Sequence, residues 1–285
     1  MGTIMKVAEL RRDLTSVFRE HGFESPELEA DFIAAEVLGV RGLELLLHDP
    51  EPLTESQLLR AEEFLQRRLK NEPFQYIFGW TPFREIDLKV GPGVLIPRPE
   101  TEYWLDFVLK SLPRSAAVCE LGTGSGAIAL SLAYERRDLT VYAGELSPAA
   151  FRWAELNRKA LALPNVHLLQ GDLYEPFPAE LKFDAVVANL PYIAEEERPG
   201  LPPNVRDYEP PEALFAPDHG HALMERAIRE APLHLRSDRA MLFFEIGETQ
   251  GERLRGFTLR EGFFTEAEVL PDQYGVPRLL AARRC

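Results

Sequence analysis

Strand-like and helical segments alternate along the chain from residue 116 to residue 246. Apolar runs typical of buried strands cover 116–121, 141–145, 166–170, 183–189 and 241–246. Helical patterns begin between them at Gly126, Pro148 and His221. Such alternation is characteristic of α/β folds, so we predict a doubly wound sheet. The last two apolar runs, 263–270 and 278–282, leave no room for a helix and are predicted to pair antiparallel.

The first 73 residues have a different, helical pattern. Apolar residues recur there at three- and four-residue steps, and Ser25-Pro26 and Thr54 are residue types that begin helices. Aromatic residues, prolines and the alternating stretch 86–90 then indicate a hairpin. In a chain of 285 residues we therefore expect three parts. They are a helical domain over 1–73, a hairpin linker over 74–95 and an α/β domain over 96–285.

Composition argues against several classes of protein. The formal net charge of -14 disfavours direct nucleic-acid binding, because affinity for phosphate depends on clustered Lys and Arg. Cys119 and Cys285 lie far apart, and the six histidines form no metal-binding pair, so we expect neither a disulfide nor a metal. No apolar run approaches the roughly 20 residues of a membrane span, and the amino terminus has no secretory pattern. We expect a cytoplasmic monomer that contacts no membrane.

A glycine-rich segment follows the first strand of the alternation and opens a helix. Its residues are Glu120, Leu121, Gly122, Thr123, Gly124, Ser125 and Gly126. Glycines at such a turn let the backbone approach a nucleotide-like cofactor closely. Glu145 ends the next strand, where an acid can accept hydrogen bonds from both hydroxyls of a ribose. These two features fit NAD and S-adenosylmethionine equally well, because both ligands contain an adenosine.

Two later strand ends favour S-adenosylmethionine. Asp172 follows the third strand, where it can reach an adenine amine, and the fourth strand ends in Asn189-Leu190-Pro191-Tyr192. An amide nitrogen is a weak nucleophile, so a site that methylates it needs acceptors that hold both N–H groups in the reacting geometry. The Asn189 side-chain oxygen and the Leu190 carbonyl are two such acceptors. Pro191 stiffens the turn, and Tyr192 offers a face to the planar amide.

With these motifs the chain resembles the release-factor glutamine methyltransferases of the HemK/PrmC type, over nearly its whole length. Four further blocks are similar to that family, namely residues 72–79, 95–102, 209–215 and 244–247. The block Ile96-Pro97-Arg98-Pro99-Glu100-Thr101-Glu102 is the most specific of them. The family's asparagine motif is usually N-P-P-Y, so this chain departs from it at Leu190. It also has Glu145 where aspartate is common.

The resemblance implies both a fold and a reaction. The implied fold is a class I methyltransferase sheet of seven strands, the last ones antiparallel, with a helical amino-terminal domain that helps to hold the substrate. The implied reaction moves a methyl group from S-adenosylmethionine to the glutamine of the Gly-Gly-Gln loop of peptide-chain release factors.

The resemblance also implies which residues form the site. The implied cofactor contacts are Glu120, Gly122, Thr123, Gly124, Ser125, Gly126, Glu145, Asp172, Leu173 and Asn189. The implied lining of the glutamine pocket is Asn189, Leu190, Pro191 and Tyr192. We single out Leu173 as a neighbour of the adenine and Asn189 as a contact of both ligands.

Other functions stay open at the level of sequence. A methyltransferase that acts on a ribosomal-protein glutamine shares the asparagine motif, and enzymes that methylate an exocyclic amine of a nucleic-acid base use a closely similar pocket. The acidic composition and the block 97–100 favour the release factor. A binding module that has the cofactor fold without catalysis is a further alternative, and the intact Asn189 and Tyr192 argue against it.

Overall fold

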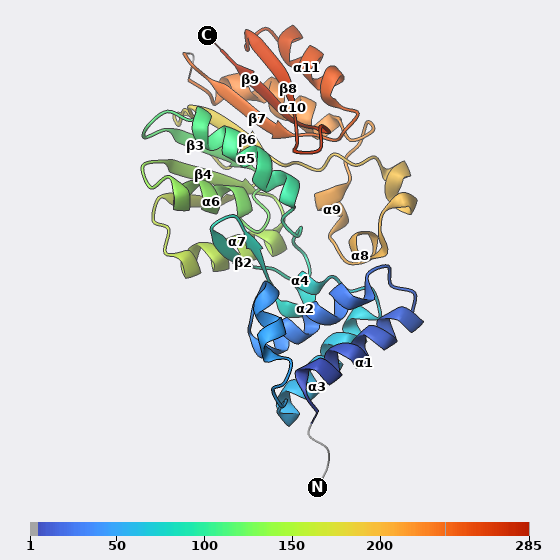
Figure 1. Cartoon of the computed structure of the whole chain (residues 1–285). Helices are drawn as coiled ribbons and strands as arrows, with labels where there is room; N and C mark the ends of the chain where they lie inside the picture. Colours follow the sequence, from blue (N-terminus) through green and yellow to red (C-terminus); the bar gives the residue numbers. More distant parts are fainter. Residues whose placement is uncertain (1–4, 237, 285) are drawn as a thin grey trace. The chain divides into compact units, whose positions relative to one another are not determined.

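The computed structural model describes residues 5–236 and 238–284 (Figure 1). By its internal contacts the chain divides into two compact units, one that ends at Phe78 and one that begins at Gly79. Cys119 is buried and has a free thiol, whereas Cys285 and residues 1–4 lie outside the described part of the chain. Within that part, no helix is both long and apolar enough to cross a membrane.

The first unit is built of helices, as the sequence pattern predicted. They are α1 (Val7–Glu20), α2 (Pro26–Leu38), the 3₁₀ helix η1 (Gly42–His48), α3 (Glu55–Arg68) and α4 (Phe74–Phe78). Thr54 caps α3 by accepting a hydrogen bond from the Gln57 N–H at 3.3 Å, and Pro26 is the first residue of α2. The partly buried ion pair between Arg68 and Glu29, at 2.6 Å, joins α3 to α2.

Helix α4 differs from the expectation for this segment. The sequence indicated a hairpin linker from residue 74, but residues Phe74–Phe78 are helical and lie in the first unit. Phe74 and Phe78 stack on each other with ring centroids 5.1 Å apart and pack against the apolar core of the helices. Burial of these rings explains why the helical part continues to Phe78. The hairpin itself forms a few residues later, from β1 (Trp80–Phe83) and β2 (Ile86–Lys89).

The second unit contains a seven-stranded sheet of order β5-β4-β3-β6-β7-β9-β8. The strands are β3 (Ala117–Leu121), β4 (Thr140–Glu145), β5 (Val166–Gln170), β6 (Ala185–Ala188), β7 (Met241–Glu245), β8 (Glu266–Pro271) and β9 (Pro277–Arg283). Strands β3 to β7 are parallel, while β9 is antiparallel to both β7 and β8. Both the parallel sheet and the antiparallel pairing of the last two strands confirm the sequence prediction.

Helices connect and cover these strands. They are α5 (Pro99–Ser111), α6 (Ala127–Glu135), α7 (Pro148–Leu161), α8 (Pro203–Arg206), α9 (Pro211–Leu214), α10 (Ala222–Glu230) and α11 (Gly251–Arg260), with the 3₁₀ helices η2 (Glu195–Gly200) and η3 (Ala231–Leu233). Alternate residues of one strand point to opposite faces of the sheet. In β6, Ala185 and Val187 therefore pack with α5 and α6, while Val186 and Ala188 pack with α10 and α11. The unit thus has three layers, helix, sheet and helix (Figure 1).

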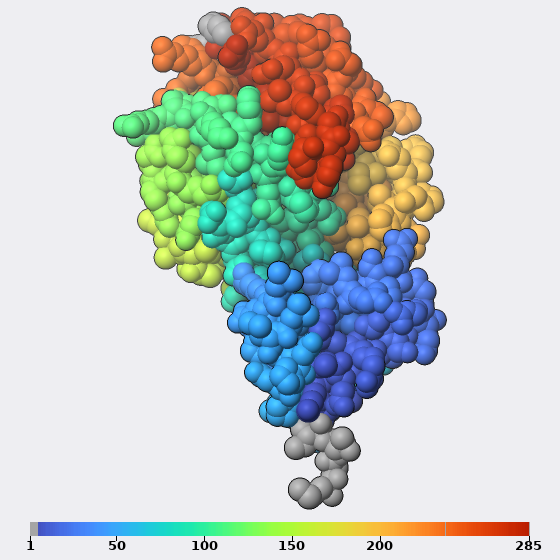
Figure 2. Space-filling model, viewed as in Figure 1, coloured from blue at the N-terminus to red at the C-terminus, as the bar shows by residue number. Residues whose placement is uncertain are grey.

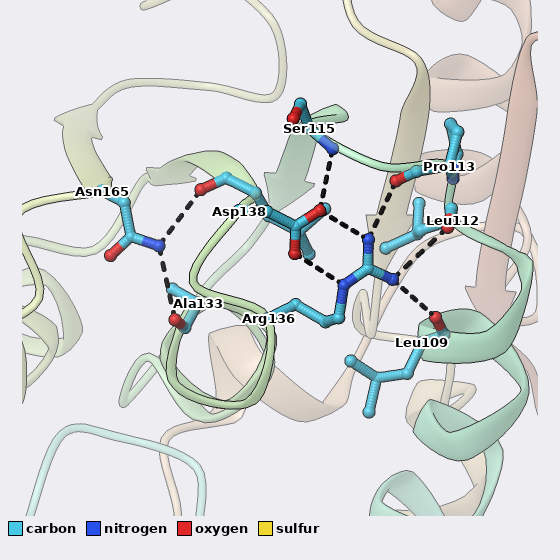
Figure 3. A network of polar contacts seen from close by, with 9 residues as sticks. Leu109, Leu112, Pro113, Ser115, Ala133, Arg136, Asp138 and Asn165 are labelled. Carbon is cyan, nitrogen blue, oxygen red and sulfur yellow. Dashed lines mark hydrogen bonds and ion pairs between the residues drawn. The ribbon is translucent and has the colours of Figure 1, made fainter.

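A polar network secures the segments that lead into β3 and β4, at the amino ends of these strands (Figure 3). Arg136, which follows α6, donates to the Leu109 carbonyl at 3.2 Å and to the Pro113 carbonyl at 3.0 Å. It also forms two hydrogen bonds with the Asp138 carboxylate, at 2.7 and 2.8 Å. Asp138 in turn accepts from the Ser115 N–H at 2.8 Å. The end of α5 is therefore fixed to the start of two strands.

Candidate active site

The carboxyl ends of β3, β4, β5 and β6 surround one pocket in the second unit. Its empty space is about 1010 Å³ including the part open to solvent. The residues expected from the sequence that line it are Glu120, Gly122, Thr123, Gly124, Ser125, Glu145, Asp172, Leu173, Asn189, Leu190 and Pro191. Of the expected residues, Gly126 and Tyr192 are not part of this lining.

The glycine-rich loop has the conformation that glycine favours. Gly122 and Gly124 have φ values of 67° and 58°, in the left-handed region. Gly126 also has a positive φ, 89°, and a Cβ at that position would stand 2.7 Å from the Leu130 Cδ1 atom. Gly126 therefore serves the tight start of α6 behind the loop, which explains why it does not line the pocket.

Glu120 is buried beneath this loop, with 1% of its surface exposed. Its Oε2 atom accepts hydrogen bonds from the Thr123 hydroxyl at 2.5 Å and from the Ala129 N–H at 3.0 Å. Burial raises the pKa of Glu120 to about 8, because an apolar surrounding disfavours the charged form. The carboxyl group thus joins the loop to the first turn of α6 and is mostly protonated near neutral pH.

Glu145, at the end of β4, is also largely buried and faces the same loop. Its Oε2 atom accepts from the Gly124 N–H at 2.7 Å, and its Oε1 atom accepts from the Ser147 N–H at 2.8 Å. Burial raises the pKa of Glu145. Each carboxylate oxygen has more than one lone pair, so both oxygens can still accept a hydrogen bond from a ligand in the pocket.

Asp172, beyond the end of β5, is held by a cation from α10. Its Oδ2 atom accepts from the Arg226 guanidinium at 2.6 Å, and Arg226 also pairs with Glu230 at 2.8 Å. The next residue, Leu173, is buried and has a positive φ of 45°. These contacts place a carboxylate and an apolar side chain next to each other in the pocket lining.

A second pocket meets the first one at Asn189. Both pockets are lined by Leu95, Arg98, Asn189 and Ala213. The second is also lined by Glu100, Tyr192, Ile193, Leu201, Pro202, Val205, Leu214, Glu245 and Arg278. At the surface, the red atoms of the carboxyl-terminal strands adjoin the gold atoms of the segment after β6 (Figure 2). Asn189 and Tyr192, three residues apart in the motif, therefore line the same second pocket.

A chain of hydrogen bonds lies behind the asparagine motif. The Asn189 Nδ2 group donates to the Thr101 hydroxyl at 3.3 Å, and Thr101 donates to Glu245 Oε2 at 2.5 Å. The same Oε2 atom accepts from the Trp104 indole at 2.8 Å, and Oε1 accepts from the Tyr192 hydroxyl at 3.3 Å. Burial raises the pKa of Glu245 and that of Tyr192.

A further buried acid, Glu209, fixes the backbone at Ile96 and the side chain of Arg98. It accepts from the Ile96 N–H at 3.0 Å and from the Arg98 guanidinium at 2.5 Å. Burial is the largest influence on the pKa of Glu209 and raises it, while the Arg98 charge acts in the opposite direction. The segments 93–98 and 210–213 each contribute residues to the lining of the first pocket, so this ion pair holds two walls together.

Several lining residues were not expected from the sequence. Val94, Leu146 and Leu223 supply apolar walls of the first pocket, and Thr101 and Arg98 supply polar ones. Leu146 directly follows Glu145, the last residue of a predicted strand, and this position could have identified it as a lining residue. Thr101 and Arg98 lie in the block 95–102, whose resemblance pointed to importance without a role. Among the described residues, no three His, Cys, Asp or Glu side chains are grouped to hold a metal ion.

The second unit has helices on both faces of a sheet whose last two strands are antiparallel, and a glycine-rich loop and acidic residues lie at the carboxyl ends of its parallel strands. These features define a class I methyltransferase. S-adenosylmethionine is the general methyl donor of this class. A solved methyltransferase structure from Pyrococcus furiosus is similar in fold, with a TM-score of 0.53 and 17% identity over 81% of this chain and 98% of the other. Residues 104–200 match the family model described as methyltransferase small domain.

The relatives specify the family within that class. Residues 9–79 match the family model described as PrmC N-terminal domain. The release factor glutamine methyltransferase of Geobacter sulfurreducens is 34% identical over 281 residues, which cover 99% of this chain and 96% of the relative. The protein of that name from Moorella thermoacetica is 38% identical and covers 92% and 93%. The chain therefore belongs to the release factor glutamine methyltransferase family.

Proposed function

We propose that this enzyme transfers a methyl group from S-adenosylmethionine to the side-chain amide nitrogen of a glutamine. The proposed substrate is the Gly-Gly-Gln glutamine of peptide-chain release factors. The observation that carries the proposal is the position of Asn189, which lines both the glycine-loop pocket and the second pocket. A group at this junction can touch a donor on one side and an acceptor on the other, which a transfer between two ligands requires.

The first pocket has the chemistry to hold S-adenosylmethionine. The loop 122–126 brings backbone close to a ligand, and Glu145 and Asp172 can accept hydrogen bonds from ribose hydroxyls and an adenine amine. Leu146 and Leu173 provide apolar surface for the adenine ring. Glu120 lies nearer the sheet, under the loop. When bound, S-adenosylmethionine supplies an electrophilic methyl group on a positively charged sulfur.

The second pocket has the chemistry to hold a primary amide. Of the four residues expected around the amide, Asn189 and Tyr192 line this pocket, while Leu190 and Pro191 line the first pocket next to Asn189. The Asn189 side-chain oxygen and the Leu190 carbonyl can accept one N–H each where the two pockets meet, which aims the nitrogen lone pair at the first pocket. Pro191 restricts the backbone of the turn, and the Tyr192 ring covers the amide plane. Positive charge develops on the nitrogen as it gains the methyl group, so both acceptors interact more strongly in the transition state than with the bound amide. The nitrogen becomes a neutral secondary amide again by releasing one of its two protons to solvent.

The substrate assignment is supported by the names of the relatives, which act on release factors, at 34% and 38% identity over nearly the full chain. We propose that the helical unit, which ends at Phe78, helps to hold the release factor. We also propose a cytoplasmic monomer that binds no nucleic acid directly, in keeping with the net charge of -14. Light scattering of the purified enzyme and titration with labelled RNA test the last two statements.

The reaction is tested by mass spectrometry of a purified release factor after incubation with the enzyme and S-adenosylmethionine. We expect one added methyl group on the Gly-Gly-Gln glutamine, lost with Asn189→Ala. Asn165→Ala is a matched control, because Asn165 donates to the Ala133 and Leu139 carbonyls in the network of Figure 3, away from the pocket. Methyl transfer to nucleic acid or to a ribosomal protein in place of the release factor would overturn the substrate assignment.

A further inference from the structure

Asn189 can present either its oxygen or its NH₂ group to a substrate, and only the oxygen can accept a substrate N–H. The inference rests on the proposed function and identifies the side chains that decide which end of the Asn189 amide faces the substrate. We propose that Thr101 and Glu245 are positioning residues that hold the Asn189 side-chain amide with its oxygen toward the substrate pocket.

The three groups come from distant parts of the chain and meet behind the pocket. Thr101 lies in the first turn of α5, Asn189 follows β6 and Glu245 is the last residue of β7. Thr101 is 3% exposed and Glu245 is 2% exposed, so water competes little for their hydrogen bonds. The Thr101 hydroxyl lies 2.5 Å from Glu245 Oε2 and 3.3 Å from Asn189 Nδ2.

The direction of each hydrogen bond follows from the donors available. The Trp104 indole N–H can only donate, and it points at Glu245 Oε2 at 2.8 Å, so Oε2 is an acceptor. The single proton of the Thr101 hydroxyl therefore also goes to Oε2, at 2.5 Å. Only lone pairs of the Thr101 oxygen are left to face Asn189. These lone pairs accept a proton, so the NH₂ group of Asn189 must be the part that faces Thr101.

These hydrogen bonds fix which end of the Asn189 amide group faces the substrate. With Nδ2 bound to Thr101, the Asn189 Oδ1 atom faces away from Thr101. A rotated amide would set its oxygen against the Thr101 lone pairs and its NH₂ group against the substrate NH₂ group, which is unfavourable at both ends. This order of donors holds for ionised Glu245 and for Glu245 with its proton on Oε1, because Oε2 then has only lone pairs to offer to Thr101 and Trp104. Glu245 Oε1 accepts from the Tyr192 hydroxyl at 3.3 Å, so Glu245 supports both Asn189, through Thr101, and Tyr192.

The experiment compares Thr101→Val with Thr101→Ser. Valine has nearly the shape of threonine without the hydroxyl, whereas serine keeps it. Thr258→Val is a matched control, because Thr258 is fully buried and its hydroxyl only donates to the Leu254 carbonyl within α11. We measure kcat and KM for release-factor methylation, the Kd for S-adenosylmethionine and hydrogen exchange of the Asn189 side-chain amide by NMR. The Asn189 signal is assigned by its loss in Asn189→Ala.

For Thr101→Val we expect kcat to fall by up to about 100-fold, the scale of a misplaced catalytic group, with a Kd for S-adenosylmethionine close to that of the native enzyme. The Asn189 amide protons should exchange faster in this variant. Thr101→Ser should restore most of the lost rate and the slow exchange, and Thr258→Val should change neither.

The outcomes separate the inference from the proposed function. If native enzyme methylates the release factor and Thr101→Val retains its kcat and its slow exchange, Thr101 does not position Asn189 and the inference is overturned. If native enzyme transfers no methyl group to the release factor, the proposed function fails. The exchange rates of Asn189 in Thr101→Val and Thr101→Ser then still decide whether Thr101 holds the amide.

Discussion

Replacement of Glu120 by glutamine should remove a large part of the pH dependence of stability. The pKa of Glu120 is 4.5 in an ordinary environment and is raised to about 8 in the folded protein, mainly by burial. As the pH rises from 4.5 to about 8, the unfolded chain loses this proton while the folded chain keeps it. The folded state then binds more protons, so native stability falls over this interval and levels off above it.

The size of the effect follows from the same values. One pKa unit corresponds to about 1.4 kcal/mol, so the native enzyme should lose up to about 3 kcal/mol between about pH 5.5 and about pH 8.5 through this group alone. Glutamine is neutral throughout and can keep its oxygen in the hydrogen bonds that Oε2 accepts from Thr123 and Ala129. Glu120→Gln should therefore gain stability relative to the native enzyme as the pH rises.

Urea unfolding at both pH values, without ligand, measures this difference. The matched control is Glu252→Gln, because the Glu252 side chain is 88% exposed, and it should follow the native enzyme at both pH values. If the free energy of unfolding of Glu120→Gln runs parallel to that of the native enzyme, the carboxyl group is charged in the folded state at both pH values. The reasoning from burial would then be refuted.

Three further predictions concern other parts of the second unit. Gly126→Ala should lower the free energy of unfolding by about 1–3 kcal/mol more than Gly262→Ala in urea titrations. Both glycines have positive φ, but only a Cβ at Gly126 meets a side chain, 2.7 Å away. Glu145→Gln should raise the Kd for S-adenosylmethionine by about tenfold or more in calorimetry, since an amide presents a donor where two acceptor oxygens now stand. Arg136 holds the pKa of Asp138 below its usual value, so the stability from this pair is lost as the pH falls through that pKa. The difference in melting temperature between the native enzyme and Asp138→Asn should therefore shrink from neutral to acid pH.

The sheet could be predicted from sequence because its central strands are buried on both faces. Strand β6 has four consecutive buried apolar residues, Ala185–Ala188, and such a run bounded by polar residues is a strong local signal. Helix α5 was missed although Pro99 stands at its first position and Trp104, Leu105 and Val108 are spaced as on one helix face. Local patterns therefore identified strands better than this helix.

Some features of the candidate site could also be predicted from local sequence patterns, and others could not. The loop 122–126, Glu145, Asp172 and the asparagine motif could be found because each follows a predicted strand, and the carboxyl ends of parallel strands meet at one edge. The hydrogen bond between Thr101 and Glu245 spans 144 residues, and that between Ile96 and Glu209 spans 113. No spacing rule connects such pairs, because only the folded sheet brings them together.

Leu190 illustrates how packing can take over a role that sequence reasoning assigns to proline. Its carbonyl is present whatever the side chain, so the proposed acceptor of the asparagine motif is kept. The Leu190 side chain is 3% exposed, lies in the apolar core between the sheet and α10, and has its Cδ2 atom 3.1 Å from where a Gly122 Cβ would stand. A side chain enclosed in this way restricts the turn from outside, as a proline ring would restrict it from within. The φ of 67° favours glycine at position 122, and a Cβ there would also require the Leu190 side chain to shift by a few tenths of an ångström. The glycine-rich loop and Leu190 therefore pack directly against each other.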